Sequence, residues 1–237
     1  MFASGVYWLQ IMVENLSYIS DRRKQISQRI ELAAKSVGRE PKNISLIAVS
    51  KRQTEERIDA LWLSGHRLYG ENLVDEAERR WQDKRADNPE LKLHLIGHLQ
   101  SNKAERAVAL FDVIETLDSL KLAKKLNAAM KKLNLWPQVL IQVNTGEEPQ
   151  KFGILPNELV GFLKEIREEA DLNISGLMCI PPKNDEAGLH FALLAKLAKQ
   201  QSLTKLSMGM SKDFETAIQF GATSVRIGSA LFGEREA

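Results

Sequence analysis

Short apolar segments alternate along the chain with longer amphipathic ones. The apolar segments have the length of buried strands, and the segments between them carry apolar residues on one helical face. Leu122, Leu126 and Met130, for example, recur every four residues. The pattern predicts eight strands, near residues 45–49, 67–69, 93–96, 113–116, 138–143, 174–179, 203–207 and 224–227. It predicts helices near residues 16–37, 55–64, 74–84, 102–109, 120–133, 156–169, 188–201 and 213–220.

Eight strands that alternate with helices are typical of a closed parallel barrel. The predicted fold class is therefore α/β, a single (β/α)8 TIM barrel with an extra N-terminal helix. A doubly wound open sheet is the alternative. No linker rich in Pro, Gly or Ser divides the chain, so we expect one barrel domain at residues 14–237 after an N-terminal extension at residues 1–13.

Composition and charge narrow the function classes. The 33 basic and 31 acidic residues give a formal charge of +2, which provides no general electrostatic argument for binding nucleic acid. Cys179 is the only cysteine and the four histidines form no metal-binding motif, so we expect neither an internal disulfide nor a metal. Residues 1–13 lack the basic start of a secretory signal, and no segment reaches the roughly 18 apolar residues of a membrane span. We expect a cytoplasmic protein.

Polar residues gather directly after the predicted strands, at the end where such barrels carry their chemistry. Lys51 follows the first predicted strand. A partly desolvated lysine at this end can lose its proton and attack an aldehyde. The alternative, for this segment alone, is a lysine whose stem covers apolar surface while its charge reaches solvent.

The loops after the last two predicted strands indicate a phosphate site, a common feature of these loops in (β/α)8 barrels. Gly209 allows a close backbone approach and Ser211 offers a hydroxyl. Gly228 and Ser229 offer two amides and a second hydroxyl. Arg226 lies within the last strand, where it faces either the barrel mouth or, as the alternative, a helix carboxylate outside.

A phosphate site opposite a reactive lysine indicates a ligand with a phosphate at one end and an aldehyde at the other. Pyridoxal 5′-phosphate has this form, and so does a phosphosugar in a lysine-dependent aldolase. The aldolases more often carry the lysine on a later strand. The position of Lys51 on the first strand therefore favours pyridoxal phosphate.

Seven ordered segments carry a family resemblance: LIAVSK (46–51), GENLVDEA (70–77), HLIGHLQSNK (94–103), VLIQVNTGEEPQKFGI (139–154), GLMCIPP (176–182), LSMGMSKDFETAI (206–218) and VRIGSALFG (225–233). With them the chain resembles the pyridoxal phosphate homeostasis proteins, single-domain relatives of the alanine racemase barrel. The resemblance assigns these residues to the cofactor: Lys51, Asn72, Ile96, His98, Ser211, Arg226, Gly228 and Ser229. It implies that Lys51 forms a Schiff base with the cofactor and that Arg226 is the partner of the pyridine nitrogen.

The same resemblance implies a monomeric protein that holds pyridoxal phosphate and buffers it or passes it to apoenzymes, rather than an enzyme. Alanine racemases add a domain that supplies a tyrosine opposite the lysine, and we expect no such domain because this chain ends ten residues after its last predicted strand. A weak amino-acid racemase or lyase is the alternative, with His98 or Lys151 as the missing acid or base. Two features depart from the family: Leu73, where an aromatic residue is frequent, and residues 1–13.

Overall fold

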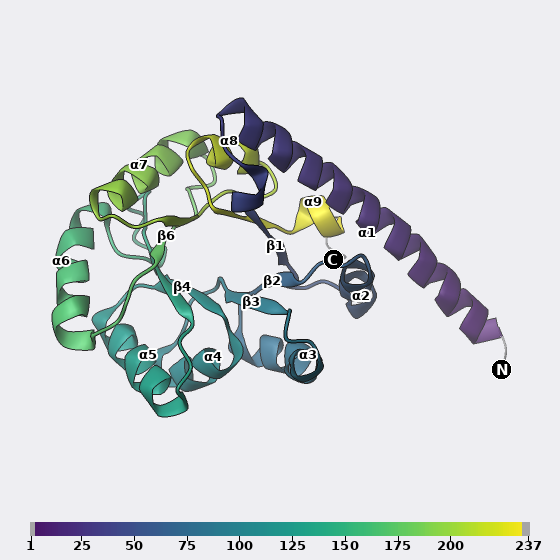
Figure 1. Ribbon diagram of the computed structural model, residues 1–237, viewed down its shortest axis with the longest axis horizontal. Helices are drawn as coiled ribbons and strands as arrows, with labels where there is room; N and C mark the ends of the chain where they lie inside the picture. The colour runs from purple at the N-terminus through teal and green to yellow at the C-terminus, as the bar shows by residue number, and fades with distance from the viewer. Residues whose placement is uncertain (1–2, 234–237) are drawn as a thin grey trace.

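The structure is a computed structural model that describes residues 3–233, with side chains from residue 16 onward. Within this part of the chain, eight parallel strands form a closed barrel in sequence order (Figure 1). The strands are β1 (Ser45–Val49), β2 (Leu68–Glu71), β3 (Lys92–Leu95), β4 (Val113–Leu117), β5 (Gln138–Gln142), β6 (Gly176–Met178), β7 (Lys205–Ser207) and β8 (Ser224–Ile227). Closure comes from β8 pairing with β1, where Ser224 faces Ser45 and Ile227 faces Ala48. The predicted TIM barrel is confirmed, and the open sheet is excluded.

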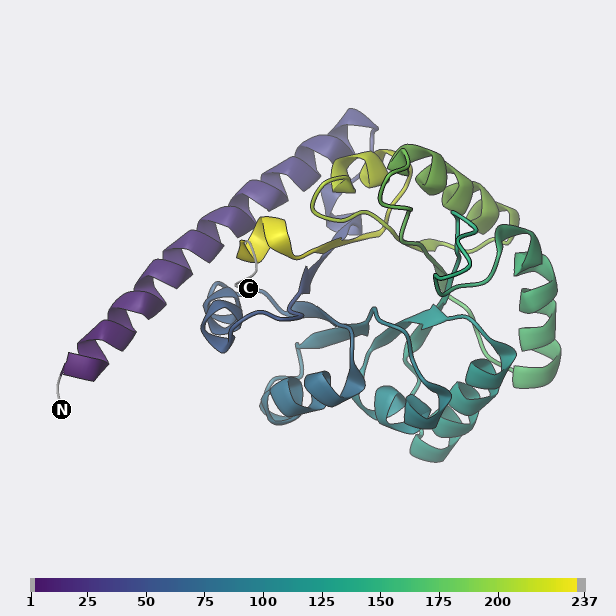
Figure 2. The same cartoon turned by 180° about the vertical axis from the view of Figure 1, so that it is seen from behind.

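Helices cover the outside of the barrel, as both ribbon views show (Figures 1 and 2). The α-helices are α1 (Ala3–Ser36), α2 (Glu55–Leu63), α3 (Val74–Asp87), α4 (Ala104–Leu110), α5 (Leu120–Leu133), α6 (Leu159–Glu165), α7 (Ala187–Gln200), α8 (Phe214–Gln219) and α9 (Ser229–Phe232). Three short 3-10 helices and one π-helical segment complete them: η1 (Pro41–Asn43), η2 (Ser101–Lys103), η3 (Pro156–Glu158) and η4 (Ile166–Ala170).

The two faces of each strand have different environments because successive side chains point to opposite sides. On β2, Tyr69 points outward and packs against Trp81 of α3, with ring centroids 4.4 Å apart. Gly70 points into the barrel, where an added Cβ would lie 2.8 Å from Ile47 and 3.0 Å from Ile96. The core therefore has two parts, one between strands and helices and one inside the barrel.

The observed helices depart from the predicted ones in several places. The first begins at Ala3 and not near residue 16, so the expected boundary at residue 13 falls inside α1. No proline interrupts residues 3–36, and a single glycine near a helix end is tolerated. The helix predicted at residues 156–169 consists of η3, α6 and η4 in succession. The short helix α9 directly after β8 was not predicted.

Helix α1 packs against α2, which follows the first strand, and against α8 and α9, which lie before and after the last strand. Its first half extends beyond the barrel in both ribbon views (Figures 1 and 2). The Arg22 guanidinium donates to the carbonyl of Ala230 at 2.9 Å. After the helix, Arg39 donates to the carbonyls of Ile218 and Ala222, both at 2.7 Å. The chain start is therefore tied to the chain end.

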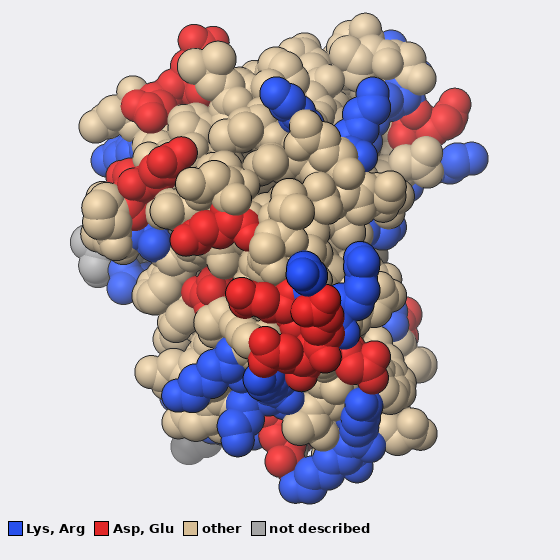
Figure 3. Space-filling model, turned by 90° about the vertical axis from the view of Figure 1, so that its left-hand side faces the viewer, with Lys and Arg blue, Asp and Glu red and all other residues tan. Residues whose placement is uncertain are grey.

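The outer surface carries charges of both signs in adjacent groups, as Figure 3 shows for the side of the barrel that bears α5 and α6. Many of these charges form ion pairs between neighbouring helices. Lys124 of α5, for example, lies 2.7 Å from Glu169 of η4. Among the described residues, no helix is long and apolar enough to cross a membrane, and no group of three or more His, Cys, Asp and Glu residues is placed to hold a metal.

Candidate functional site

Lys51 lies at the carboxyl end of the barrel, two residues after β1, and is half-buried. The preceding residue fixes its loop, because the Ser50 hydroxyl donates to the buried carboxylate of Glu71 at 2.7 Å. The same Glu71 oxygen accepts hydrogen bonds from Arg80 at 2.9 Å and Trp81 at 2.7 Å. Glu71 thus ties the lysine loop to β2 and α3, while the Lys51 side chain itself makes no hydrogen bond or ion pair with the described residues.

Asn72 follows β2 and Ile96 follows β3, the next two strands of the barrel after β1. The two loops touch closely, since a Cβ added to Gly97 would lie 2.2 Å from the Asn72 carbonyl oxygen. Only glycine fits this contact, and the Gly97 carbonyl in turn accepts from the Thr116 hydroxyl at 2.9 Å. Ile96 is buried inside the barrel. The first three strands therefore present their predicted site residues side by side.

Arg226 points into the barrel, as the sequence analysis predicted in preference to an outward position, and is 4% exposed. Its guanidinium donates to the Ser207 hydroxyl at 2.6 Å and to the Cys179 carbonyl at 2.7 Å. Glu115 lies 3.9 Å from the same guanidinium. Arg226 is thus fixed by β4, β6 and β7, and it holds a buried positive charge.

Glu115 is the central residue of a polar network inside the barrel. Its side chain is fully buried and accepts from Nδ1 of His94 at 2.6 Å and from the Ser207 hydroxyl at 2.5 Å. Burial alone would raise the pKa of the Glu115 carboxyl. The His94 hydrogen bond, with the charges of His94 and Arg226 and the hydrogen bond from Ser207, outweighs burial and lowers this pKa below its usual value. Glu115 is therefore an ionised partner for Arg226.

The two loops predicted to hold phosphate lie next to each other and next to β1. The Gly209 carbonyl accepts from the Arg226 amide at 3.0 Å, and the Ser211 hydroxyl accepts from the Ala230 amide at 3.2 Å. Gly209 has φ of 92°, and a Cβ there would lie 2.5 Å from the Cβ of Ala217, so the turn requires glycine. An added Cβ on Gly228 would lie 3.6 Å from Val49, the last residue of β1.

His98 and Lys151 lie on the same rim but have partners of their own. The His98 ring stacks on Phe152 with centroids 3.8 Å apart, and its Nδ1 lies 3.3 Å from the Asp118 carboxylate. Burial raises the pKa of the Asp118 carboxyl. Lys151 forms an ion pair with Glu148 and donates to the Pro181 carbonyl at 3.2 Å. These contacts join the loops after β3, β4 and β5.

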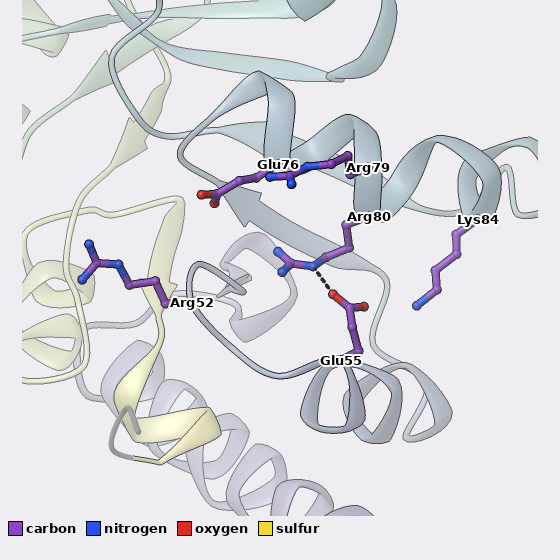
Figure 4. A pocket seen from close by; sticks show the side chains of 6 residues that line it. All are labelled: Arg52, Glu55, Glu76, Arg79, Arg80 and Lys84. Atoms are coloured by element: carbon purple, nitrogen blue, oxygen red, sulfur yellow. Dashed lines mark hydrogen bonds and ion pairs between the residues drawn. The ribbon is translucent and has the colours of Figure 1, made fainter. Parts of the chain in front are cut away.

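A charged pocket of about 560 Å³ opens beside the lysine loop, between α2 and α3 (Figure 4). Arg52 and Arg79 contribute to its lining, and Arg80 pairs there with Glu55 at 2.9 Å. Arg52 lies apart from this ion pair in the figure and has φ of 56°. The residue after Lys51 thus adds a positive charge near the rim.

The side chains on the rim fit pyridoxal phosphate chemically. Lys51 offers an amine for the aldehyde, the Gly209 turn with Ser211 and the Gly228–Ser229 segment offer donors for a phosphate, and Arg226 offers a fixed cation. The fit is best supported at Gly228. An added Cβ would have room there, so the glycine leaves space for a phosphate group to approach the backbone. That these residues contact the cofactor remains a prediction.

Two residues with a clear structural role at the site were missed by sequence reasoning, Glu71 and Glu115. Glu115 lies inside the predicted strand at residues 113–116, whereas Glu71 lies just after the predicted strand at residues 67–69. A carboxylate inside a predicted barrel strand must find a buried donor, and this requirement was the available signal for Glu115. Their partners come from elsewhere in the chain, so the role of each depends on how the barrel closes.

The fold and this rim define a barrel of the alanine racemase type, and the family model described as "Alanine racemase, N-terminal domain" matches residues 23–236. Curated relatives named pyridoxal phosphate homeostasis protein match nearly the whole chain. The relative from Pasteurella multocida is 36% identical over 92% of this chain and 98% of its own length. The one from Vibrio cholerae is 38% identical over 92% and 97%. The chain belongs to the pyridoxal phosphate homeostasis protein family.

Solved structures agree with this assignment. PipY of Synechococcus elongatus, with pyridoxal phosphate bound, is 36% identical and covers 91% of this chain and 100% of its own, with a TM-score of 0.76. An alanine racemase of Clostridium difficile shares the fold at 16% identity and a TM-score of 0.64. This chain covers 57% of that racemase.

Proposed function

We propose that this protein binds pyridoxal 5′-phosphate through Lys51 and takes part in its homeostasis, holding the cofactor and buffering or delivering it. The relatives named above and the pyridoxal phosphate bound to PipY support this proposal. The observation in this structure that carries it is the contact between Gly228 and the end of β1. That contact brings the phosphate loop next to the strand that presents Lys51.

Each proposed site residue has a distinct task. Lys51 would offer its amine to the aldehyde, which requires a loop that is fixed at Ser50 and a side chain that is free. Ser211, Gly228 and Ser229 would bind the phosphate, and Asn72, Ile96 and His98 would border the ring. Arg226 would be the partner of the pyridine nitrogen, and its permanent charge would keep that nitrogen unprotonated. When bound, pyridoxal phosphate supplies an electron sink, and an unprotonated nitrogen weakens it.

We further propose that the protein is not a racemase in its main role. A racemase needs an acid or base on each face of its substrate. Of the tyrosines with described side chains, Tyr69 is buried against Trp81, where burial raises its pKa, and Tyr18 lies on α1. Lys151 and His98 are already engaged by Glu148 and Asp118. These contacts support a role in holding the cofactor. We propose that the protein does so in the cytoplasm, as a monomer, and passes the cofactor to apoenzymes.

The first test concerns Lys51. Purified protein incubated with pyridoxal phosphate should show a visible absorbance band, which Lys51→Ala should lose because the covalent attachment point is gone. Borohydride reduction followed by peptide mass analysis should place the added mass on Lys51. Lys151→Ala is the matched control, a lysine on the same rim that should leave both results unchanged.

Two outcomes would contradict the proposal. An unmodified Lys51 in the reduced wild-type protein would remove the cofactor-binding premise. Racemisation or elimination of amino acids at enzyme-like turnover, lost in Lys51→Ala, would instead favour the alternative of a true pyridoxal-phosphate enzyme.

A further inference from the structure

The amino-terminal end of the barrel, opposite the Lys51 rim, contains a hollow of about 700 Å³. The first residues of the strands line it, and several of them are polar, among them Ser45, Gln138, Lys205 and Ser224. The interior of a (β/α)8 barrel is ordinarily filled by layers of bulky branched side chains. Polar and flexible side chains at this end leave the barrel open there. We call this hollow the amino-terminal mouth.

Positive charge dominates the mouth, although it also contains two carboxylates. Asp112 is neutralised by Arg85, at 2.8 and 3.1 Å, and by Lys92 at 3.2 Å. Glu115 is occupied by its network inside the barrel. The side-chain ammonium groups of Lys42 and Lys205, by contrast, have no hydrogen-bond or ion-pair partner among residues 16–233. Two ammonium groups are thus left to attract an anion.

A third polar group lies deeper in the mouth. His94 lines the hollow and its side chain is 14% exposed. Its Nδ1 donates to the Glu115 carboxylate. The other nitrogen, Nε2, has no hydrogen-bond partner among the described residues and is available to a ligand.

One side of the mouth is apolar. Leu68, Val113 and Leu140 contribute to its wall, and the indole of Trp136 stands beside them with 61% of its surface exposed. A hollow of this size lies within the range of about 300–1,000 Å³ that small-molecule sites occupy, and such sites combine apolar walls with a few polar groups. The mouth therefore fits a ligand with an apolar body and an anionic end.

From these observations we propose that the amino-terminal mouth is a second binding site, for small organic anions. Lys42 and Lys205 bind the carboxylate or phosphate group, His94 borders the ligand from within, and the apolar body packs against Trp136. This site lies at the other end of the barrel from Lys51 and goes beyond the proposed homeostasis function. Its existence does not depend on that function.

Calorimetric titration of the full chain tests the proposal with two aromatic dianions as probes, phenyl phosphate and phthalate, at constant ionic strength. Binding of either probe is expected, and the comparison of the two tells whether phosphate or carboxylate is preferred. The variant Lys42→Gln/Lys205→Gln should bind at least about tenfold more weakly, a loss of roughly 1.4 kcal/mol. Lys196→Gln/Lys199→Gln on α7 removes two exposed lysines elsewhere and should bind as the wild type does.

A second variant makes the result specific to the mouth. Trp136→Ala removes an exposed apolar wall and should also weaken binding, and the wild-type tryptophan fluorescence should change on titration. Absence of binding by both probes would overturn the proposal. So would equal affinity in wild type and Lys42→Gln/Lys205→Gln, because the anion would then bind elsewhere, for example at the Lys51 rim.

Discussion

Lys51 and Arg226, the two cations assigned to the cofactor, are held in opposite ways. Arg226 is buried, and its partners come from β7, from the residue after β6 and from β4 across the barrel. Lys51 is half-buried at the end of a loop that is fixed one residue earlier, at Ser50. A permanent charge benefits from a rigid position, whereas a side chain that must form and release a covalent bond needs freedom. The difference matches the two proposed tasks.

His66 provides a prediction about acid stability. Its ring donates to the Leu68 carbonyl at 2.7 Å and lies edge-on against Tyr69. Burial lowers the pKa of His66 to about 4 from an ordinary value of 6.5. As the pH falls, His66 therefore binds its proton first in the unfolded chain, and the free energy of unfolding decreases between about pH 6.5 and 4. Below about pH 4 His66 is protonated in both the folded and the unfolded state, so it no longer makes this free energy depend on pH.

Urea unfolding of wild type and His66→Gln across pH 4–8 measures this effect. The free energy of unfolding should fall more steeply with acid in the wild type than in the variant. Above pH 7 the two curves should run parallel, because the imidazole is neutral in both states. Equal slopes below pH 6.5 would show that His66 is not held neutral by the fold.

The site residues found from sequence are those with a local signal. Lys51 follows an apolar strand, and Gly209, Gly228 and Ser229 follow two others, so their position at the rim could be read from the alternating pattern. Glu115 has no such local signal. Its partner Ser207 lies 92 residues away and meets it only because the barrel brings β4 and β7 face to face.

At the scale of elements, Glu115 connects its strand β4 both to its neighbour β3 and to the distant strands β7 and β8. Through His94, Ser207 and Arg226 it joins β4 to β3, β7 and β8 across the barrel interior. These side-chain bonds add to the ladders between adjacent strands. The carboxylate is thus an internal cross-link, and the apolar cluster of Val113, Leu140 and Met178 fills the space beside it.

Glu115→Gln should destabilise the protein by roughly 3–5 kcal/mol, because it leaves Arg226 as an uncompensated buried charge. Urea unfolding gives this value, and the visible absorbance of the bound cofactor should shift as well. The double variant Glu115→Gln/Arg226→Met removes both charges and should recover part of the lost stability. A loss below about 1 kcal/mol in the single variant would mean that Glu115 does not stabilise Arg226.

The number and order of the strands could be predicted because each strand is an apolar segment with polar flanks. The helix boundaries were harder to predict from the sequence. The segment 156–169 has a continuous helical pattern, yet the backbone changes from 3-10 to α to π geometry along it. The four residues of α9 are too few for a periodic pattern. The start of α1 was predicted too late in the sequence, because the apolar residues up to position 13 were interpreted as a separate N-terminal segment.

For the whole molecule, Arg39 is a critical link between chain start and chain end. Arg39→Ala removes two hydrogen bonds from a charged donor and leaves the carbonyls of Ile218 and Ala222 without it. We expect a loss of about 2–3 kcal/mol in the free energy of unfolding, measured in urea. Arg167→Ala removes an exposed arginine from η4 and is the matched control, with little change expected. An equally small effect of Arg39→Ala would contradict the link.

The position of α1 has a consequence for how the protein is made. Helix α1 and strand β1 are synthesised before their partners α8, α9 and β8. Until these partners emerge, the apolar side of α1, which includes Ile19 and Ile26, and one edge of β1 are exposed. Exposed apolar surface and open strand edges are what chaperones recognise and what drives aggregation. The barrel can close only after β8 has been synthesised.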